Sequence, residues 1–260
     1  MKHTFAISAY GKSMYLEECI KSLLRQSVVS DIIMCTSTDN SHIRGLADKY
    51  KIKLYVREGK PDIARDWNFA YEKADSNLVT IAHQDDIYLK DYTKTLLKYK
   101  AKYKDMSLFC TSSISLINNK KVTYNLVNII KKLLRLKLRI AALNHLKFVK
   151  RLSISLGNPI ICPSCTYDKK LCGDNIFPTG YKFVLDWLTL LKLSAKDGRW
   201  ICVEKPLIVY RIHEESATKL CIDSSKRQEE EAKMFELLLP KPLAKVIKYF
   251  YRGAEYVYKK

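Results

Sequence analysis

The chain has 260 residues, of which 47% are hydrophobic, and its formal net charge at pH 7 is +19. This length and composition suit one globular domain, or one domain with an appendage. No run of about 18 apolar residues occurs, which excludes a bilayer-spanning helix, and no N-terminal stretch resembles a signal peptide. We therefore expect a cytoplasmic protein with reduced cysteines and an anionic partner that explains the charge.

The first hundred residues alternate between short apolar strands and amphipathic helices. Strands are predicted over residues 4–9, 31–36, 53–57 and 78–82. The first intervening helix places Leu16, Ile20 and Leu23 on one apolar stripe, and Ser13 is positioned to cap it. The alternation predicts an α/β fold, with a mostly parallel sheet flanked by helices on both faces.

The sequence changes character after a predicted helix over 91–103 and a predicted strand over 106–117. Residues 127–151 are rich in Leu, Ile, Lys and Arg and contain no acidic residue. A helix over 183–194 and a strand over 201–210 follow. The C-terminal stretch has the pattern of two helices separated near Pro240 and Pro242.

Two adjacent acids, Asp85 and Asp86, directly follow the fourth predicted strand. Ligands of such sheets bind beyond the carboxyl ends of the strands. Mg²⁺ and Mn²⁺ are held by one or two carboxylates together with the phosphate oxygens of a substrate. The acid pair therefore predicts a metal and diphosphate site, and a helix cap or a solvated turn is the simpler alternative.

A single acid, Asp186, interrupts an almost wholly apolar helical run. A carboxylate in such a run needs a partner or a chemical task, because burying its charge is costly. Burial raises the proton affinity of a carboxylate and suits it to act as a general base. The alternatives are a helix cap or a salt-bridged core acid.

Six further segments have a recognisable pattern, and they are Ser8–Tyr10 with the helix from Tyr15, Ser37–Ser41, Asp66–Ala70, His83–Ile87, Leu185–Trp187 and Tyr210–Ser216. In this order along the chain, the six together resemble glycosyltransferase family 2. The resemblance covers roughly residues 4–218. It implies a GT-A fold, a nucleotide-sugar donor, a divalent metal (Mn²⁺ or Mg²⁺) and inversion at the sugar carbon.

The resemblance also implies roles for individual residues. Asp186 is the expected catalytic base. The expected metal ligands are Asp85, Asp86 and His213. The residues expected to contact the nucleotide sugar are Ser8, Tyr10, Asp39, Asn68, Asp85 and Arg211. Arg211 has a guanidinium that matches the geometry of phosphate, or it pairs with Glu214 or Glu215. Alternatively, His213 is an ordinary surface residue without a metal contact. Trp67 is expected to pack in the core.

The sequence departs from the family pattern at two places. His83 stands where the family often has the first acid of its motif. The sequence leaves open whether His83 contacts the ribose, the metal or neither. Met34 and Cys35 replace the acid pair that often reads the nucleobase, so that only Asp39 of that acidic segment survives. Cys162 and Cys165 have a redox or half-zinc spacing without a second pair, and we expect an acceptor-facing loop there.

These patterns predict four parts of the chain. They are a nucleotide-sugar-binding half at 1–125, a basic amphipathic helical insertion at 126–152, an acceptor-side half with the base at 153–220, and a helical tail at 221–260. The predicted reaction transfers a hexose or N-acetylhexosamine from a UDP-type donor to an acceptor hydroxyl. The expected acceptor is a lipid-linked glycan in cell-surface polysaccharide synthesis.

Three other functions stay open from the sequence. A nucleotidyltransferase also uses strand-end acids, but it normally has a Gly-rich phosphate loop where this chain has only Gly11. A nucleic-acid-binding protein would interleave its basic residues with aromatic ones, whereas here they alternate with Leu and Ile, and we expect no nucleic acid partner. The third alternative is a non-catalytic relative of glycosyltransferase family 2.

The basic segment from Val127 to Arg151 is expected to attach the protein peripherally to the anionic cytoplasmic face of a membrane. The tail from Lys241 to Lys260 is expected to help. The predicted apolar contacts are Ile129, Ile130, Leu133, Leu134, Leu136, Leu138, Ile140 and Leu143, and the predicted cations are Lys131, Lys132, Arg135, Lys137, Arg139, Lys147, Lys150 and Arg151. The alternative is a helix packed on the domain with a solvated basic rim.

Overall fold

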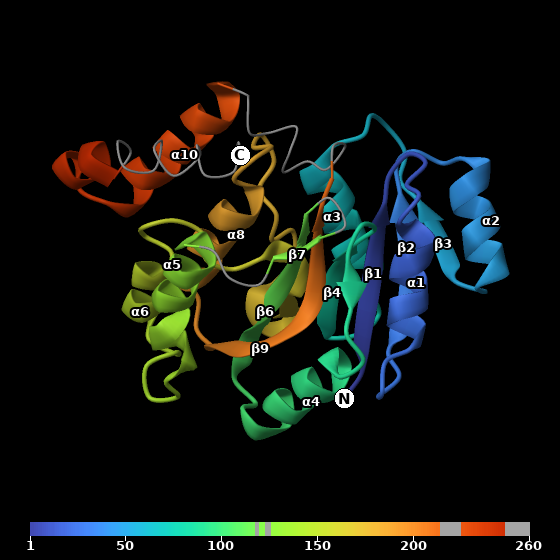
Figure 1. The fold of residues 1–260 in the computed structure, drawn as a ribbon, viewed down its shortest axis with the longest axis horizontal. Helices are drawn as coiled ribbons and strands as arrows, with labels where there is room; N and C mark the ends of the chain where they lie inside the picture. The colour runs from blue at the N-terminus through green and yellow to red at the C-terminus, as the bar shows by residue number, and fades with distance from the viewer. Residues whose placement is uncertain (118–119, 123–125, 214–224, 248–260) are drawn as a thin grey trace.

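The structure is a computed structural model that describes residues 1–117, 120–122, 126–213 and 225–247. Within these residues a single mixed sheet runs through the centre of the molecule, with helices on both sides (Figure 1). The strands follow the order β3-β2-β1-β4-β8-β6-β9-β5, and β7 pairs with β6. The predicted α/β fold is confirmed.

The N-terminal half forms a parallel block. Its strands are β1 (His3–Ala9), β2 (Asp31–Thr36), β3 (Lys53–Val56) and β4 (Leu78–His83), and its helices are α1 (Leu16–Leu24), α2 (Ser41–Lys49) and α3 (Ile63–Lys73). Ser8 lies level with Cys35 on one neighbouring strand and with His83 on the other. The carboxyl ends of β1, β2 and β4 therefore meet at one edge of the sheet.

The second half is mixed rather than parallel throughout. The long strands β6 (Met106–Ile117) and β9 (Arg199–Ile212) pair in parallel. The short β8 (Thr166–Asp168) joins them to β4 by antiparallel pairing on both sides, and β5 (Ile87–Tyr88) pairs antiparallel with β9. The remaining elements of this half are β7 (Lys120–Val122), α4 (Tyr92–Lys102), η2 (Cys162–Ser164), α7 (Lys169–Cys172) and α8 (Leu185–Ser194).

Two hydrophobic cores cover the two faces of the sheet. Because side chains alternate along a strand, Phe5 and Ile7 enter the core beneath α1, α2 and α4, whereas Ala6 enters the other. The second core packs α3 and α8 on the sheet and includes Met234 and Phe235 of α10 (Ser225–Leu238). The described part of the predicted C-terminal tail therefore packs into the domain core.

The basic insertion is broken into several short elements instead of one helix. It consists of α5 (Leu126–Arg135), the 3₁₀ turn η1 (Leu136–Arg139) and α6 (Lys147–Ser153). The break follows Arg135, whose buried guanidinium donates to the carbonyl of Pro159 at 2.7 Å and pairs with Glu204 at 3.3 Å. Residues 241–247 form a second C-terminal helix after Pro240, as predicted, and residues 248–260 lie outside the described part. None of the described helices has the length and apolarity needed to cross a bilayer.

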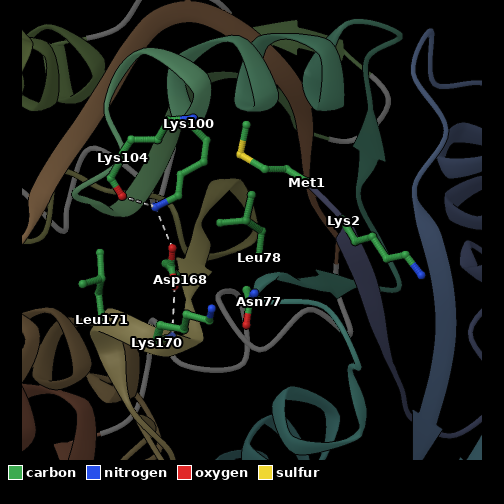
Figure 2. A pocket seen from close by; sticks show the side chains of 9 residues that line it. All are labelled: Met1, Lys2, Asn77, Leu78, Lys100, Lys104, Asp168, Lys170 and Leu171. Carbon is green, nitrogen blue, oxygen red and sulfur yellow. Dashed lines mark hydrogen bonds and ion pairs between the residues drawn. The ribbon is translucent and has the colours of Figure 1, made fainter.

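A buried ion pair anchors α4 at the amino end of the strands (Figure 2). Lys100 Nζ lies 2.6 Å from Asp168 Oδ2, beside a cavity of about 260 Å³. The same ammonium donates to the carbonyls of Lys104 at 2.7 Å and Met106 at 3.0 Å. Asp168 also accepts the backbone N–H of Lys170 at 2.9 Å. Each N–H of the ammonium thus has an acceptor, which makes this pair a structural clamp.

We expect Lys100→Met to lower the free energy of unfolding by about 3 kcal/mol, because it leaves the buried Asp168 carboxylate without its cation. Lys98→Met, on the exposed side of the same helix, is the matched control and should change stability by less than about 0.5 kcal/mol. Urea denaturation measures both variants. Equal unfolding midpoints would show that the clamp contributes nothing.

Candidate active site

The strand β4 ends in an acidic turn, residues 84–86, at the carboxyl edge of the sheet. Gln84 ties this turn to the end of β1, since its side chain accepts the N–H of Tyr10 at 2.9 Å and donates to the carbonyl of Tyr10 at 3.0 Å. The backbone of Tyr10 is thereby held, whereas its side chain is exposed. The ends of β1 and β4 consequently keep a fixed spacing.

Asp85 is held between the loop before α1 and the end of β9. Ser13 Oγ donates to Asp85 Oδ1 at 3.0 Å, and His213 Nε2 lies 3.3 Å from Asp85 Oδ2. Ser13 was expected to cap α1, but the helix begins at Leu16 without a side-chain cap. The expectation was wrong because the Ser13 hydroxyl bonds to the acidic turn, which a local sequence pattern does not reveal.

Asp86 points into the protein and is only 1% exposed. Its Oδ1 accepts the backbone N–H of Arg211 at 2.9 Å, and its Oδ2 has no hydrogen-bond partner among the described residues. Burial raises the pKa of this carboxyl well above its ordinary value, although the Arg211 N–H acts in the opposite direction. Asp86 therefore fastens the acidic turn to β9.

Arg211 joins three parts of the site. Its Nε donates to the carbonyl of Asp85 at 3.0 Å, and its Nη2 pairs with Glu18 Oε2 at 2.6 Å. The guanidinium also lies 4.3 Å above the ring of Tyr15, whose ring in turn lies 4.7 Å from that of His213. These contacts hold α1 against the acidic turn. The alternative partners Glu214 and Glu215 lie outside the described residues, and the contact of Arg211 to a diphosphate stays a prediction.

His83 is a half-buried, neutral histidine at the end of β4. Its ring packs on Trp67 with the ring centres 4.8 Å apart, and Trp67 belongs to the core, as predicted. Burial lowers the pKa of His83 to about 4. Its Nε2 has no hydrogen-bond partner in the described part of the chain. The imidazole is therefore uncharged at neutral pH.

The other expected nucleotide contacts have different surroundings. Ser8 is the second-to-last residue of β1 and lies level with His83. Asp39 is exposed and pairs with Arg44 on α2. Asn68 uses both ends of its amide on the backbone of Phe177, donating to the carbonyl at 2.7 Å and accepting the N–H at 3.0 Å. Nucleotide binding by these three residues stays a prediction, and the amide of Asn68 already has a structural task.

Asp186 lies in the first turn of α8. Its Oδ2 accepts the side-chain N–H of Asn158 at 2.8 Å, and its Oδ1 accepts the N–H of Trp187 at 2.8 Å. The orientation of the Asn158 amide is fixed because its oxygen accepts the N–H of Ile160 at 3.0 Å. Burial raises the pKa of Asp186 to about 6, while the Trp187 N–H and the charge of Lys131 lower it. The carboxylate is thus oriented and made more basic.

Two residues that the sequence did not single out build the surroundings of Asp186. Asn158 is the first. Glu230 of α10 is the second, and its buried carboxylate accepts the backbone N–H groups of Lys182 at 3.1 Å and Phe183 at 2.8 Å, just before α8. Neither has a local signal, because each acts on a segment that is distant along the chain.

The thiol of Cys162 is affected by the charges of both Asp86 and Asp186. Cys162 is buried in η2, and burial raises the pKa of its thiol well above the ordinary value, with the charges of Asp186 and Asp86 adding to the effect. Both carboxylates therefore act on one thiol. Cys165 is also buried and reduced. Among the described residues, no group of three His, Cys, Asp or Glu side chains is arranged to hold a metal by itself.

A family model described as "Glycosyl transferase family 2" matches residues 4–166, more than half of the chain. The chain belongs to glycosyl transferase family 2. The resemblance inferred from the sequence is thus confirmed, and the protein is a glycosyltransferase. Comparison with curated proteins gives no match.

Solved glycosyltransferase structures share the fold. S. aureus TarS 1-349 in complex with UDP-GlcNAc superposes with a TM-score of 0.67 at 16% identity, over 95% of this chain and 70% of that one. Mannosyltransferase PcManGT from Pyrobaculum calidifontis, in complex with GDP-Man and Mn²⁺, gives 0.65 at 14% identity, over 96% and 69%. Glucosyl-3-phosphoglycerate synthase from Mycobacterium tuberculosis, in complex with phosphoglyceric acid, gives 0.56 at 11% identity, over 92% and 81%. The GT-A fold expected for the family is confirmed.

The raised pKa of Asp186 makes a prediction about pH. A general base works only when it is deprotonated, so we expect kcat/KM to rise with pH and to level off above about pH 6. Asp186→Asn should lower kcat by roughly 10² to 10⁴. Steady-state kinetics between pH 4.5 and 8.5 measure both effects. Retention of more than about a tenth of the wild-type kcat would rule out the base.

A folding measurement serves as the control. The folded pKa of Asp186 is higher than the ordinary value, so the native state holds a proton that the unfolded state has lost between about pH 4 and 6. The contribution of Asp186 to stability is therefore greatest below that window and is lost as the pH rises through 6. Asp186→Asn should still unfold in one cooperative transition at pH 7.5, because loss of the buried charge offsets the one hydrogen bond that its amide nitrogen cannot accept.

Proposed function

We propose that this glycosyltransferase moves a hexose or N-acetylhexosamine from a UDP-type sugar nucleotide to an acceptor hydroxyl, with inversion. The observation that carries the proposal is the presence of two carboxylates in unlike surroundings, Asp85 just after β4 and Asp186 in the first turn of α8. Both side chains are partly exposed. Asp85 lies among polar partners, whereas desolvation raises the pKa of Asp186 to about 6. A carboxyl with a raised proton affinity suits the role of base.

In the proposed reaction, Asp186 Oδ2 or Oδ1 takes the proton of the acceptor hydroxyl. The hydroxyl oxygen then forms a bond to the anomeric carbon as the bond from that carbon to the diphosphate oxygen breaks. Attack opposite the leaving group inverts the configuration. Asn158 and the N–H of Trp187 keep the carboxylate oriented for this proton transfer.

The residues at the acidic turn fit a divalent metal. Asp85 Oδ2 and His213 Nε2 lie 3.3 Å apart, close enough to bind one ion together. Mn²⁺ and Mg²⁺ sites of this kind take their other ligands from the phosphates of the substrate, which accounts for the small number of protein ligands. When bound, the ion would neutralise charge that develops on the leaving diphosphate. PcManGT, which shares the fold, is in complex with GDP-Man and Mn²⁺.

We assign the metal contacts to Asp85 and His213 and a supporting role to Asp86. Asp86 was also expected to be a ligand, but it is buried and bonded to the backbone of Arg211. Its raised pKa favours the protonated form, which is a poor metal ligand. Ser13, which donates to Asp85, orients the ligating carboxylate.

We expect Asp85→Ala to abolish the increase in UDP affinity that Mn²⁺ produces. Ser13→Ala should weaken Mn²⁺ binding by roughly tenfold, since it removes only an orienting hydrogen bond. Asp48→Ala, at an exposed position on α2, is the matched control and should leave binding unchanged. Calorimetric titration of UDP with and without Mn²⁺ measures all three. Unchanged affinity in Asp85→Ala, or full wild-type activity in excess chelator, would contradict the metal site.

We further propose that the acceptor is a lipid-linked glycan in cell-surface polysaccharide synthesis and that the enzyme attaches to the cytoplasmic face of an anionic membrane. The support is an exposed apolar stripe on α5 and η1. Ile129 and Leu133 on α5, Leu136 on η1 and Ile140 just after η1 are 50%, 63%, 48% and 46% exposed. Apolar side chains in such a row, beside cations, suit an anionic lipid surface.

Only part of the predicted basic set borders this stripe. Arg135 and Lys150 are buried, and Lys150 donates to the carbonyls of Lys196 and Gly198. Lys131 lies near Asp186, whose charge acts on it, and burial lowers its pKa to about 8. These three cations face protein. The exposed cations that remain are Lys132, Lys137, Arg139, Lys147 and Arg151. Among the predicted apolar contacts, Leu138 is buried and Leu143 packs on the core.

We expect vesicles that contain anionic lipid to bind the enzyme and neutral vesicles to bind it weakly. Replacing Lys132, Lys137 and Arg139 with Glu should weaken binding at least roughly hundredfold, at about 1 kcal/mol for each charge. Lys94, Lys98 and Lys104 changed to Glu form a control of equal charge on and after α4. Co-sedimentation at several salt concentrations measures this. The proposed membrane-binding surface would be refuted if both variants lost the same affinity for vesicles, or if binding did not depend on the charge of the lipid.

A further inference from the structure

A hollow of about 520 Å³ lies between α3, the loop of residues 175–179 and Lys192 of α8. We call it the α3 hollow. None of the residues that line it belongs to the acidic turn, and Asp186 is not among them. Of the residues predicted to contact the nucleotide sugar, Asn68 alone lines the hollow, and its amide is already bonded to the backbone of Phe177. The proposed reaction therefore assigns no role to the rest of the lining.

The walls of the α3 hollow are held in place by internal contacts. Asn68 binds the backbone of Phe177 through two hydrogen bonds of 2.7 and 3.0 Å. Arg57 is fixed by Asp66 at 2.7 Å and by the carbonyls of Glu58 and Lys60, each at 2.7 Å. A cavity whose walls are fixed in advance binds a ligand with a smaller loss of conformational entropy.

Two cations at the hollow have no counter-charge among the described residues. Arg65 and Lys192 are exposed, and neither side chain forms an ion pair or hydrogen bond with any residue that the structure describes. Glu72 is the acid in the lining, and it pairs with the adjacent Lys73 at 3.0 Å. The charge of Arg57 is balanced by Asp66. Two uncompensated positive charges therefore border one space, which favours an anionic ligand.

The rest of the lining suits a sugar. Phe69, which is partly exposed, supplies apolar surface of the kind on which the C–H face of a sugar ring packs, whereas the ring of Phe177 is buried in the core. Asn175 and Thr179 offer an amide and a hydroxyl that bond to no described residue. Phosphate alone would not need the aromatic surface, and a neutral sugar would not need the two cations.

We propose that the α3 hollow is a subsite for a negatively charged sugar unit of the acceptor glycan. This rests on the glycosyl transfer proposed above, because it names a property of the acceptor. The loop that lines the hollow continues through residues 180–184 directly into α8 and Asp186. A unit held there would keep the acceptor chain against the segment that carries the base. The negative charge comes from a phosphate or from a carboxylate, and the test separates the two.

The test is titration of the full chain with glucose 6-phosphate, glucuronate and glucose, followed by NMR or calorimetry in the absence of donor. We expect one or both anions to bind, more weakly as salt increases, and glucose to bind at least several-fold more weakly than the better anion. The anion that binds more tightly identifies the acceptor charge. Arg65→Glu with Lys192→Glu should weaken that binding by about tenfold or more. Lys94→Glu with Lys98→Glu makes the same charge change on α4 and should have no effect.

The proposal would be overturned if the variant with Arg65→Glu and Lys192→Glu bound the anionic sugar as tightly as the wild type. It would also be overturned if the wild type bound neither anion. So would displacement of the sugar by UDP with Mn²⁺, which would assign the hollow to the donor. Sugar binding needs neither donor nor turnover. Failure of the proposed transfer would therefore show separately, as absent UDP binding in a protein that still binds the anionic sugar.

Discussion

Arg211 is a buried cation whose desolvation is offset by three kinds of partner at once: the carboxylate of Glu18, the carbonyl of Asp85 and the ring of Tyr15. A buried guanidinium is tolerated only when its donors are occupied. Because those partners come from α1 and from the acidic turn, satisfying Arg211 brings both to the end of β9. The position of Asp85 beside His213 depends on that arrangement.

The acceptor side depends on a second set of long-range contacts. Asn158 orients Asp186, and Glu230 from α10 holds the backbone that leads into α8. The first contact acts directly on the Asp186 carboxylate, whose charge is disfavoured by burial, and the second acts on the backbone before α8. The two acids therefore differ by environment rather than by residue type: Asp85 has polar partners and partial exposure, and Asp186 has a raised pKa.

Helix α5 connects the proposed membrane surface to the base. On its inner side, Arg135 is buried against the domain and the charge of Lys131 acts on Asp186. On its outer side are the exposed Ile129 and Leu133. The proposed lipid contact thus lies on the side of α5 opposite the side that carries Lys131, whose charge acts on Asp186. Attachment would therefore bring the base close to a lipid-linked acceptor.

The sequence by itself determined the order of strands and helices in the first 117 residues, apart from the short β5. It also singled out Asp85 and Asp186, because hydrophobic periodicity and an acid after an apolar run are local signals. The strands over 31–36 and 106–117 agree with β2 and β6. Tertiary structure alone decided the partners. Glu18 meets Arg211 across 193 positions and Asn158 meets Asp186 across 28. It also decided the break after Arg135, because a hydrogen bond between distant segments is selected by packing and desolvation, which leave no periodic trace in the chain.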